Sequence, residues 1–265
     1  MTNPWQVVFN EIICIVRNAS FVRRSLFPLS VCSVSLFLPV LCFAQTLKLY
    51  INNPTAAPYT TDRDDGLLDI VVSEAFRRVG LELVLIKVPA ERALRNANEG
   101  IDDGDLSRIA GLEKVYPNLI QVPEHLFVMK FVAFSRFPGR RFDHWNSLEP
   151  YAIGLIRGWK ILENGTQGFP NVLTLDNAAQ LFRMLRKGRL DVALYSQALG
   201  LHIIRQQGWT DVFPAAKPLA ARRMYLYLHK KHRRWVSRIA AALADIKREG
   251  LYDRLYQEKI ATLDR

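Results

Sequence analysis

Short apolar runs alternate with amphipathic segments through most of this chain, and that alternation constrains the fold more than any other feature. Strand-like runs occupy residues 47–51, 83–87, 104–107, 119–122, 127–135, 151–156, 172–175, 191–195 and 224–228. Apolar residues at helical spacing predict helices over residues 67–79, 89–100, 159–163, 176–188 and 234–247, and another that ends near residue 207. Strands that alternate with helices predict an α/β protein with mostly parallel sheets.

Several predicted helices carry their own end signals. Gly80 and Gly188 are typical C-terminal stops, and Pro89 suits a first helical turn. Asp176 is expected to cap the helix that follows it. The chain shows no repeat and no low-complexity tract, so two successive α/β blocks followed by a final strand and helix describe its organisation.

The first 44 residues differ in character from the rest. Residues 26–44 contain no charge and follow the basic pair Arg23 and Arg24. A basic pair, an apolar run and the small residue Ala44 are typical of a secretory signal peptide cleaved after Ala44, which predicts a periplasmic protein. A retained membrane anchor is the alternative, because 19 residues nearly span a bilayer. Two prolines and three serines in this stretch weaken that alternative.

Cysteine placement and charge exclude several classes of protein. Cys14, Cys32 and Cys42 all precede residue 45, so the main body has no disulfide scaffold, zinc ribbon or catalytic thiol. The formal net charge of +11 raises the question of nucleic-acid binding. Predicted export argues against that partner, and a solvated surface or attraction to anionic ligands explains the basic residues more simply.

Known catalytic motifs are missing from the sequence. It contains no H-E-x-x-H, no G-x-S-x-G, no phosphate loop and no G-x-G-x-x-G. The histidines are scattered and have no acidic or cysteine partner at ligand spacing. We therefore expect no metal, no cofactor and no catalytic residues.

The order of several segments resembles bacterial periplasmic solute-binding proteins of family 3, which ABC importers use for small polar molecules. The matching segments are LKLYINNPTAAPYT, the pair Asp65-Gly66 before a helix, EG followed by IDDGDLSR, AIGLIRGWKILE, KGRLDVALYS, MYLYLHKKH and IKREGLYDRLYQEK. The resemblance covers the whole chain after residue 44.

The resemblance implies a two-lobed α/β fold of the type II periplasmic-binding-protein class, with two crossing hinge strands. Residues 45–124 and 224–265 would form lobe 1, and residues 125–223 would form lobe 2. The lobes of such proteins close on a ligand in the cleft between them. The expected function is capture of a small polar, anionic solute by a monomer, for import through an ABC transporter permease or for sensing.

The sequence departs from the amino-acid-binding members of that family. Their loop with a carboxylate-gripping arginine corresponds here to SRIAGLEKVYPN, so Arg108 is the nearest candidate. Their ammonium-holding aspartate corresponds to Ser196, which carries no charge. The amino-acid clamp is therefore only half present.

Candidate ligand contacts follow the strands and helix starts of the predicted first lobe. Tyr59 follows the first strand, where loops of open α/β sheets reach ligands, although a packed tyrosine fits equally. Glu91 and Arg92 lie in a first helical turn, with a solvated helix face as the alternative. Arg108 could grip an anion with its guanidinium fork, or it could pair with Asp105 or Glu113 instead.

The predicted second lobe supplies a second group of candidates. Arg157, Gly158 and Trp159 follow one of its strands. Gly158 would allow close backbone approach, and Trp159 would either cover the ligand or pack in the core. Tyr195 and Ser196 end the next strand and would face the cleft in the family arrangement.

An enzyme on the same scaffold is the alternative function. Such lobes also serve as dehydratases of small acids, and a catalyst would need a perturbed acid or base in the cleft. Glu91 with Arg108 is the pairing that the sequence offers for that role.

Overall fold

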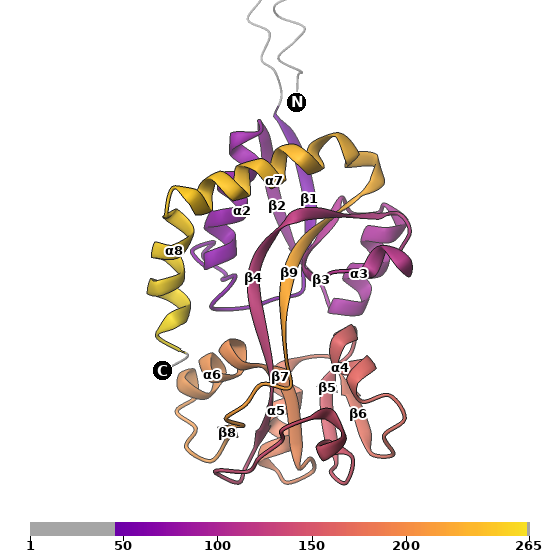
Figure 1. Ribbon diagram of the computed structural model, residues 1–265, viewed down its shortest axis with the longest axis vertical. Helices are drawn as coiled ribbons and strands as arrows, with labels where there is room; N and C mark the ends of the chain where they lie inside the picture. The colour runs from indigo at the N-terminus through magenta and orange to yellow at the C-terminus, as the bar shows by residue number, and fades with distance from the viewer. Residues whose placement is uncertain (1–45, 264–265) are drawn as a thin grey trace, which may run out of the picture. The chain divides into compact units, whose positions relative to one another are not determined.

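The computed structural model describes residues 46–263, which belong to one compact unit (Figure 1). The predicted signal peptide lies outside the described residues. The strands are β1 (Leu47–Asn53), β2 (Leu81–Lys87), β3 (Gly104–Ile109), β4 (Leu119–Ser135), β5 (Ile153–Ile156), β6 (Val172–Leu175), β7 (Val192–Ser196), β8 (Phe213–Pro214) and β9 (Ala220–His229). The helices are α2 (Leu67–Arg78), α3 (Ala90–Glu99), α4 (Lys160–Gly165), α5 (Ala178–Arg186), α6 (Gln197–Gln206), α7 (Arg233–Arg248) and α8 (Leu251–Tyr256).

Within the described residues the strands form one nine-stranded sheet in the order β2-β1-β3-β9-β4-β7-β5-β6, with β8 beside β4. β1 pairs in parallel with β2 and β3, and β5 pairs in parallel with β6 and β7. We call β1–β3 with α2, α3, α7 and α8 the first half, and β5–β7 with α4, α5 and α6 the second half. The mostly parallel arrangement within each half is the one that alternating strands and helices predict.

Two long antiparallel strands, β4 and β9, run from one half to the other, as Figure 1 shows. β9 also pairs with β3 of the first half, and β4 also pairs with β7 of the second half. The predicted lobe boundaries, at residues 124 and 223, fall inside these two strands. The division into lobes at those residues stays a prediction.

The sequence predicts two strands, 119–122 and 127–135, where the structure has the single strand β4. The interruption in the pattern is Pro123, which has no N–H to donate. The β4–β9 register shifts between Gln121 and His125, and again between His125 and Phe127. Pairing therefore resumes after an irregularity instead of ending at the proline.

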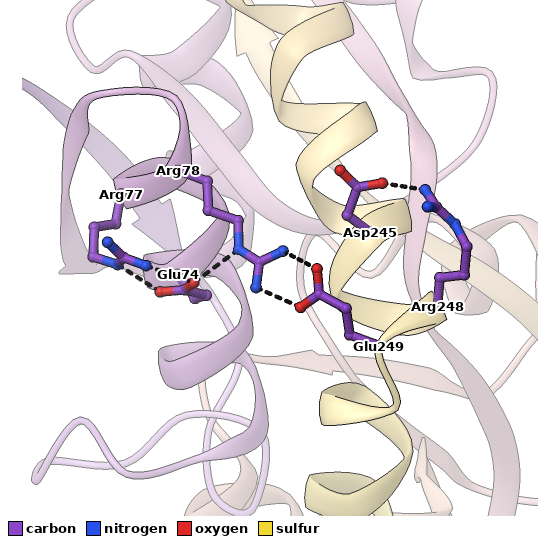
Figure 2. A network of polar contacts seen from close by, with 6 residues as sticks. All are labelled: Glu74, Arg77, Arg78, Asp245, Arg248 and Glu249. Carbon is purple, nitrogen blue, oxygen red and sulfur yellow. Dashed lines mark hydrogen bonds and ion pairs between the residues drawn. The ribbon is translucent and has the colours of Figure 1, made fainter.

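Helix α7 packs along β4 and covers the first half. It buries Val236, Ile239, Leu243 and Ile246, which recur at helical spacing on one face. At its C-terminal end, Glu249 accepts two hydrogen bonds from Arg78 of α2 at 2.7 and 2.6 Å (Figure 2). Arg78 also donates to Glu74, so a chain of ion pairs ties the end of α7 to α2.

Glu74 is the acceptor on which this chain of ion pairs converges. Arg77 donates two hydrogen bonds to its carboxylate, at 2.7 and 2.8 Å, and the Arg78 Nε donates a third at 2.8 Å. Hydrogen bonds from Arg77 and Arg78 lower the pKa of the Glu74 carboxyl to about 2. Arg248 forms a separate ion pair with Asp245, which lies three residues earlier in α7 (Figure 2). The contact between α2 and α7 is thus polar at its rim and apolar beneath.

One local prediction was wrong. Asn177, not Asp176, caps α5, because the Asn177 side chain accepts the hydrogen bond from the Gln180 N–H. The helix predicted over residues 234–247 is α7, and α8 follows it directly, with Gly250 in the left-handed conformation between the two helices. Among residues 46–263, no helix has both the length and the apolar character to cross a bilayer.

Candidate functional site

A pocket with an empty volume of about 470 Å³ lies where the two halves meet. The first half contributes residues from the segment after β1, from α3 and from β3, and the second half contributes the β5–α4 turn and the start of α4. Strands β4 and β9 form the floor with Met129, Phe131 and Met224.

The walls of this pocket are mainly apolar. Leu94, Ile109 and Leu112 line it from the first half, and Trp159 and Ile161 line it from the second. Two methionines and a phenylalanine complete the floor. Methionine adapts its shape to irregular apolar partners, so such a lining suits an apolar ligand body.

Arg108, which the sequence offers as a candidate for gripping an anion, lines the pocket but is engaged inside the protein. Its Nε donates to Asp105 Oδ2 at 2.8 Å, and its Nη2 lies 2.8 Å from the same oxygen. Nη2 also donates to the Ala90 carbonyl at 2.7 Å, and Nη1 donates to the Gly158 carbonyl at 3.5 Å. The predicted alternative, a pair with Asp105, is therefore present.

Asp105 is fully buried beneath this arginine. Burial raises the pKa of its carboxyl to about 6, and the opposing effect of Arg108 is smaller. Its Oδ1 has no hydrogen-bond partner among the described residues, and neither has Oδ1 of Asn52, its register partner on β1. The first half thus holds a buried charge in an incompletely satisfied polar layer.

On β3, Ser107 lies between Asp105 and Arg108 and has an unusual backbone conformation. Its φ is 68°, in the left-handed region that non-glycine residues seldom adopt. The β3–β9 register shifts between Asp105 and Arg108, which marks a β-bulge at this point. Bulges re-aim side chains, and Ser107 lines the pocket. Backbone strain of this kind is typical of functional sites.

Two hydroxyl groups of the pocket lining are buried without an internal partner. Ser107 Oγ and Thr55 Oγ1 have no hydrogen bond to any described residue. A buried hydroxyl without a partner costs about 1–3 kcal/mol, so such groups are rare unless they serve a ligand or a water molecule.

Gly158 brings the two halves into direct contact. Its φ is +82°, and a Cβ built on it would lie 2.4 Å from the Glu91 backbone nitrogen. Only glycine fits this approach of the β5–α4 turn to the first turn of α3. The predicted close backbone approach at Gly158 thus involves α3. Its neighbour Arg157 is exposed and lies 3.5 Å from Asp176.

An ion pair joins the halves beside this contact. Lys160 of α4 donates to Glu91 of α3 at 2.6 Å and lies 3.0 Å from Glu163. Burial lowers the pKa of Lys160, but the hydrogen bonds to the two carboxylates outweigh burial and raise it overall. Arg92, next to Glu91, is exposed and does not line the pocket.

Aromatic rings back the second-half wall. Trp159 stacks on Tyr195 with ring centroids 4.7 Å apart, and Phe131 meets Trp159 edge to face at 6.0 Å. Burial raises the pKa of the Tyr195 phenol. Tyr195 and Ser196 do not line the pocket, although Ser196 Oγ is buried without a partner in the described part of the chain.

Tyr59 lies on the other side of the crossing strands. It is buried and stacks on Phe127 with ring centroids 4.1 Å apart. It contributes to a separate small hollow of about 210 Å³ with Val128, Lys130 and Tyr256. The structure therefore brings together Arg108, Gly158 and Trp159, with Glu91 beside them, and places the other predicted residues outside the pocket lining.

Sequence reasoning missed Thr55, Ser107 and Lys160. Thr55 and Ser107 belong to the segments that were expected to reach the ligand, but no spacing signal distinguishes their hydroxyls from ordinary ones. Lys160 lies in the short helix predicted over residues 159–163, and its role depends on contact with Glu91, which lies 69 residues earlier in the chain. No group of three or more histidine, cysteine or acidic residues within 46–263 could hold a metal ion.

A second hollow lies in the second half, against α5 and α6. Arg183, Arg186 and Trp209 line it. Arg186 is held by Asp211 at 3.0 Å, and its guanidinium lies over the Trp209 ring. The first half contributes nothing to its lining.

No family model matches the chain. An uncharacterized protein of Shewanella oneidensis is 27% identical over 209 residues, which are 74% of this chain and 76% of that protein. A histidine kinase sensor domain with similarity to periplasmic binding proteins superposes with a TM-score of 0.69 at 18% identity, over 81% of this chain and 96% of that one.

Two further solved structures are similar. An ancestral arginine-binding protein bound to arginine gives a TM-score of 0.68 at 15% identity, over 80% of this chain and 97% of that chain. The GluR0 ligand-binding core of Nostoc punctiforme, in complex with L-glutamate, gives a TM-score of 0.69 at 15% identity, over 80% of this chain and 98% of that chain. The chain has their two-lobed type II periplasmic-binding-protein fold, so the predicted fold class is confirmed.

Proposed function

We propose that this protein binds a small-molecule solute in the pocket between its two halves and serves an ABC importer or a sensory system. The observation that carries the proposal is the pocket itself, which takes its walls from both halves and holds two buried hydroxyls that have no partner within residues 46–263. A solute in that position contacts both halves at once and therefore stabilises their closed arrangement.

The similar structures support this reading. One is a sensor domain of a histidine kinase, and others are amino-acid-binding proteins, including one of an amino acid ABC transporter. An ABC permease, a periplasmic location and a monomeric state are part of the proposal. The proposed periplasmic location depends on the signal peptide that the sequence predicts in residues 1–44.

The contacts of two residues bear on the finer alternatives. An anionic group on the solute, expected from the sequence, has Arg108 as its candidate partner, and Arg108 already holds Asp105. The dehydratase-like alternative needs Glu91 as a free acid or base. Its carboxylate accepts from Lys160 instead, so no observation favours catalysis over binding.

A thermal-shift screen with a matched pair of variants tests the proposal. A ligand at 100 times its Kd raises the unfolding free energy by about 2.7 kcal/mol, which a melting curve detects easily. Ile161→Trp fills the pocket from its half-buried wall, whereas Leu173→Trp adds the same ring on an exposed strand outside the pocket.

We expect compounds that stabilise the wild type to lose their effect in Ile161→Trp and to keep it in Leu173→Trp. A shift that persists in Ile161→Trp would place binding outside this pocket. If no compound from a broad screen of charged and uncharged molecules stabilises the protein, the proposed function is wrong.

A further inference from the structure

The cations of the pocket are already neutralised. Each nitrogen of the Arg108 guanidinium faces an acceptor inside the protein, as the contacts to Asp105, Ala90 and Gly158 show. A bidentate grip on a carboxylate needs two parallel N–H groups on neighbouring nitrogens. Arg108 cannot provide that fork while it holds Asp105.

Lys160, the other cation of the lining, is similarly engaged. It lies 2.6 Å from a Glu91 carboxylate oxygen and 3.0 Å from a Glu163 oxygen. Both cations therefore have their own carboxylates, and an anionic solute would have to share each cation with the carboxylates that it already holds. Desolvating an anion without a partner is strongly unfavourable.

A cationic solute meets the opposite difficulty. Of the residues that line the pocket, none carries a carboxylate. Asp105, Glu91 and Glu163 lie behind the lining and already pair with Arg108 or Lys160. An α-amino acid, which carries both charges, would lose hydration at each, would find no carboxylate in the lining for its ammonium, and would have to share the cations with internal carboxylates.

The remaining surface specifies a different ligand. Aliphatic, thioether and indole groups surround most of the space, which suits an apolar body. Ser107 Oγ and Thr55 Oγ1 are buried hydroxyl groups of this lining that have no partner among the described residues, so they are available to bind it. A hydroxyl both donates and accepts, so these two groups match an alcohol, a carbonyl or an amide equally well.

We infer, on the basis of the proposed function, that the pocket takes a compact, uncharged, mainly apolar molecule with one hydrogen-bonding head group. The head group lies at Ser107 and Thr55, and the body packs against Trp159 and the methionines of the floor. The ion pairs of Arg108 and Lys160 position the walls and do not bind the ligand.

Two matched ligand sets test this inference by calorimetry. The first contains 3-phenylpropan-1-ol, 3-phenylpropanoate, 3-phenylpropylamine and L-phenylalanine, which share a phenyl group and three carbons. The second contains 4-methylpentan-1-ol, 4-methylpentanoate, 4-methylpentylamine and L-leucine. We expect the alcohol of at least one set to bind with a Kd about tenfold or more below those of its charged partners, because only the alcohol keeps every group compensated.

A carboxylate, an amine or an amino acid that binds as tightly as the matched alcohol would overturn the inference. If no member of either set binds, the charge of the ligand found in the broader thermal-shift screen tests the inference instead. A charged ligand with an effect abolished by Ile161→Trp overturns the inference and leaves the proposed function standing, whereas an uncharged apolar ligand supports both. The absence of any ligand overturns both.

Two substitutions test the position of the head group. Ser107→Gly removes the hydroxyl at a backbone conformation that glycine adopts readily, and Thr55→Val removes the other hydroxyl at nearly constant shape. Each should weaken binding of the uncharged ligand about fivefold, the effect of one hydrogen bond. Unchanged affinity in both variants would show that the head group does not lie there.

Discussion

The two halves of the sheet bury different chemistry. The first half encloses polar and charged side chains, among them Asn52, Asp103, Asp105, Ser107 and Arg108. The second half packs rings that contact one another and Phe134 of the crossing strand β4; these rings are Trp159, Phe182, Tyr195 and Trp209.

This difference assigns a separate task to each half. Polar groups held by hydrogen bonds define one geometry, which suits recognition of a head group. Packed aromatic rings offer a large apolar wall at a low entropic cost. The pocket lies at the border between the two and draws on both.

The largest expected effect comes from the buried ion pair of the first half. Arg108→Ala should lower the free energy of unfolding by about 3–5 kcal/mol, because it leaves Asp105 buried without a cation. Chemical denaturation measures this loss in the free energy of unfolding. The exposed pair of Arg186 and Asp211 in the second half is the control, and Arg186→Ala should cost about 0–1 kcal/mol. Equal losses would show that the burial of the first pair is unimportant.

The contact between the halves comes next. Gly158→Ala should destabilise the protein by about 1–3 kcal/mol, because the added Cβ meets the Glu91 backbone and φ is positive. Gly168 has a similar φ of +85°, but no described atom lies within 4 Å of a Cβ built there. Gly168→Ala therefore reports backbone strain alone. If both variants melt together, the close approach of the two halves at Gly158 contributes nothing.

A smaller effect is expected from the aromatic wall. Phe182 contacts the rings of Phe134, Tyr195 and Trp209. Phe182→Leu should cost about 1 kcal/mol, because an apolar residue remains but the ring contacts are lost. The loss should be independent of pH between 4 and 7, since the residue touches no titrating group of the pocket. A marked pH dependence would mean that the two halves are electrostatically coupled.

The first half should instead show its own pH dependence. Burial raises the pKa of Asp105 from an ordinary value of 3.8 to about 6, so the folded state holds its proton more tightly than the unfolded chain does. The stability it contributes is complete below about pH 4 and is lost as the pH rises through about 6. The difference between the unfolding profiles of the wild type and Asp105→Asn should show this fall. A flat difference would mean that Arg108 fully offsets the burial.

Much of the fold could be predicted from the sequence, because periodicity reports directly on helices and strands. The bounds of β6 match the prediction, and those of α2 and α7 differ by one residue. β4 could not be predicted as one strand, because Pro123 breaks the local pattern while tertiary pairing with β9 continues beyond it. Tertiary contacts override local signals at such positions.

The candidate site could be predicted only in part. Arg108, Gly158 and Trp159 lie at the pocket because residues that follow strands gather at one edge of an α/β sheet. The bulge that turns Ser107 leaves no trace in composition or spacing. The sequence leaves two partners open for Arg108, namely Asp105 and Glu113, and only the folded geometry shows that Asp105 is the partner.

Hydrogen exchange with and without the bound ligand tests the central claim most directly, namely that one small molecule contacts both halves at this pocket. The account predicts slower exchange in two separate segments, β3 with its following turn (residues 104–112) and the β5–α4 turn with α4 (residues 156–165). Residues 179–187 and 203–209, around the second hollow, should not change. Protection confined to one half, or centred on the second hollow, would contradict the account.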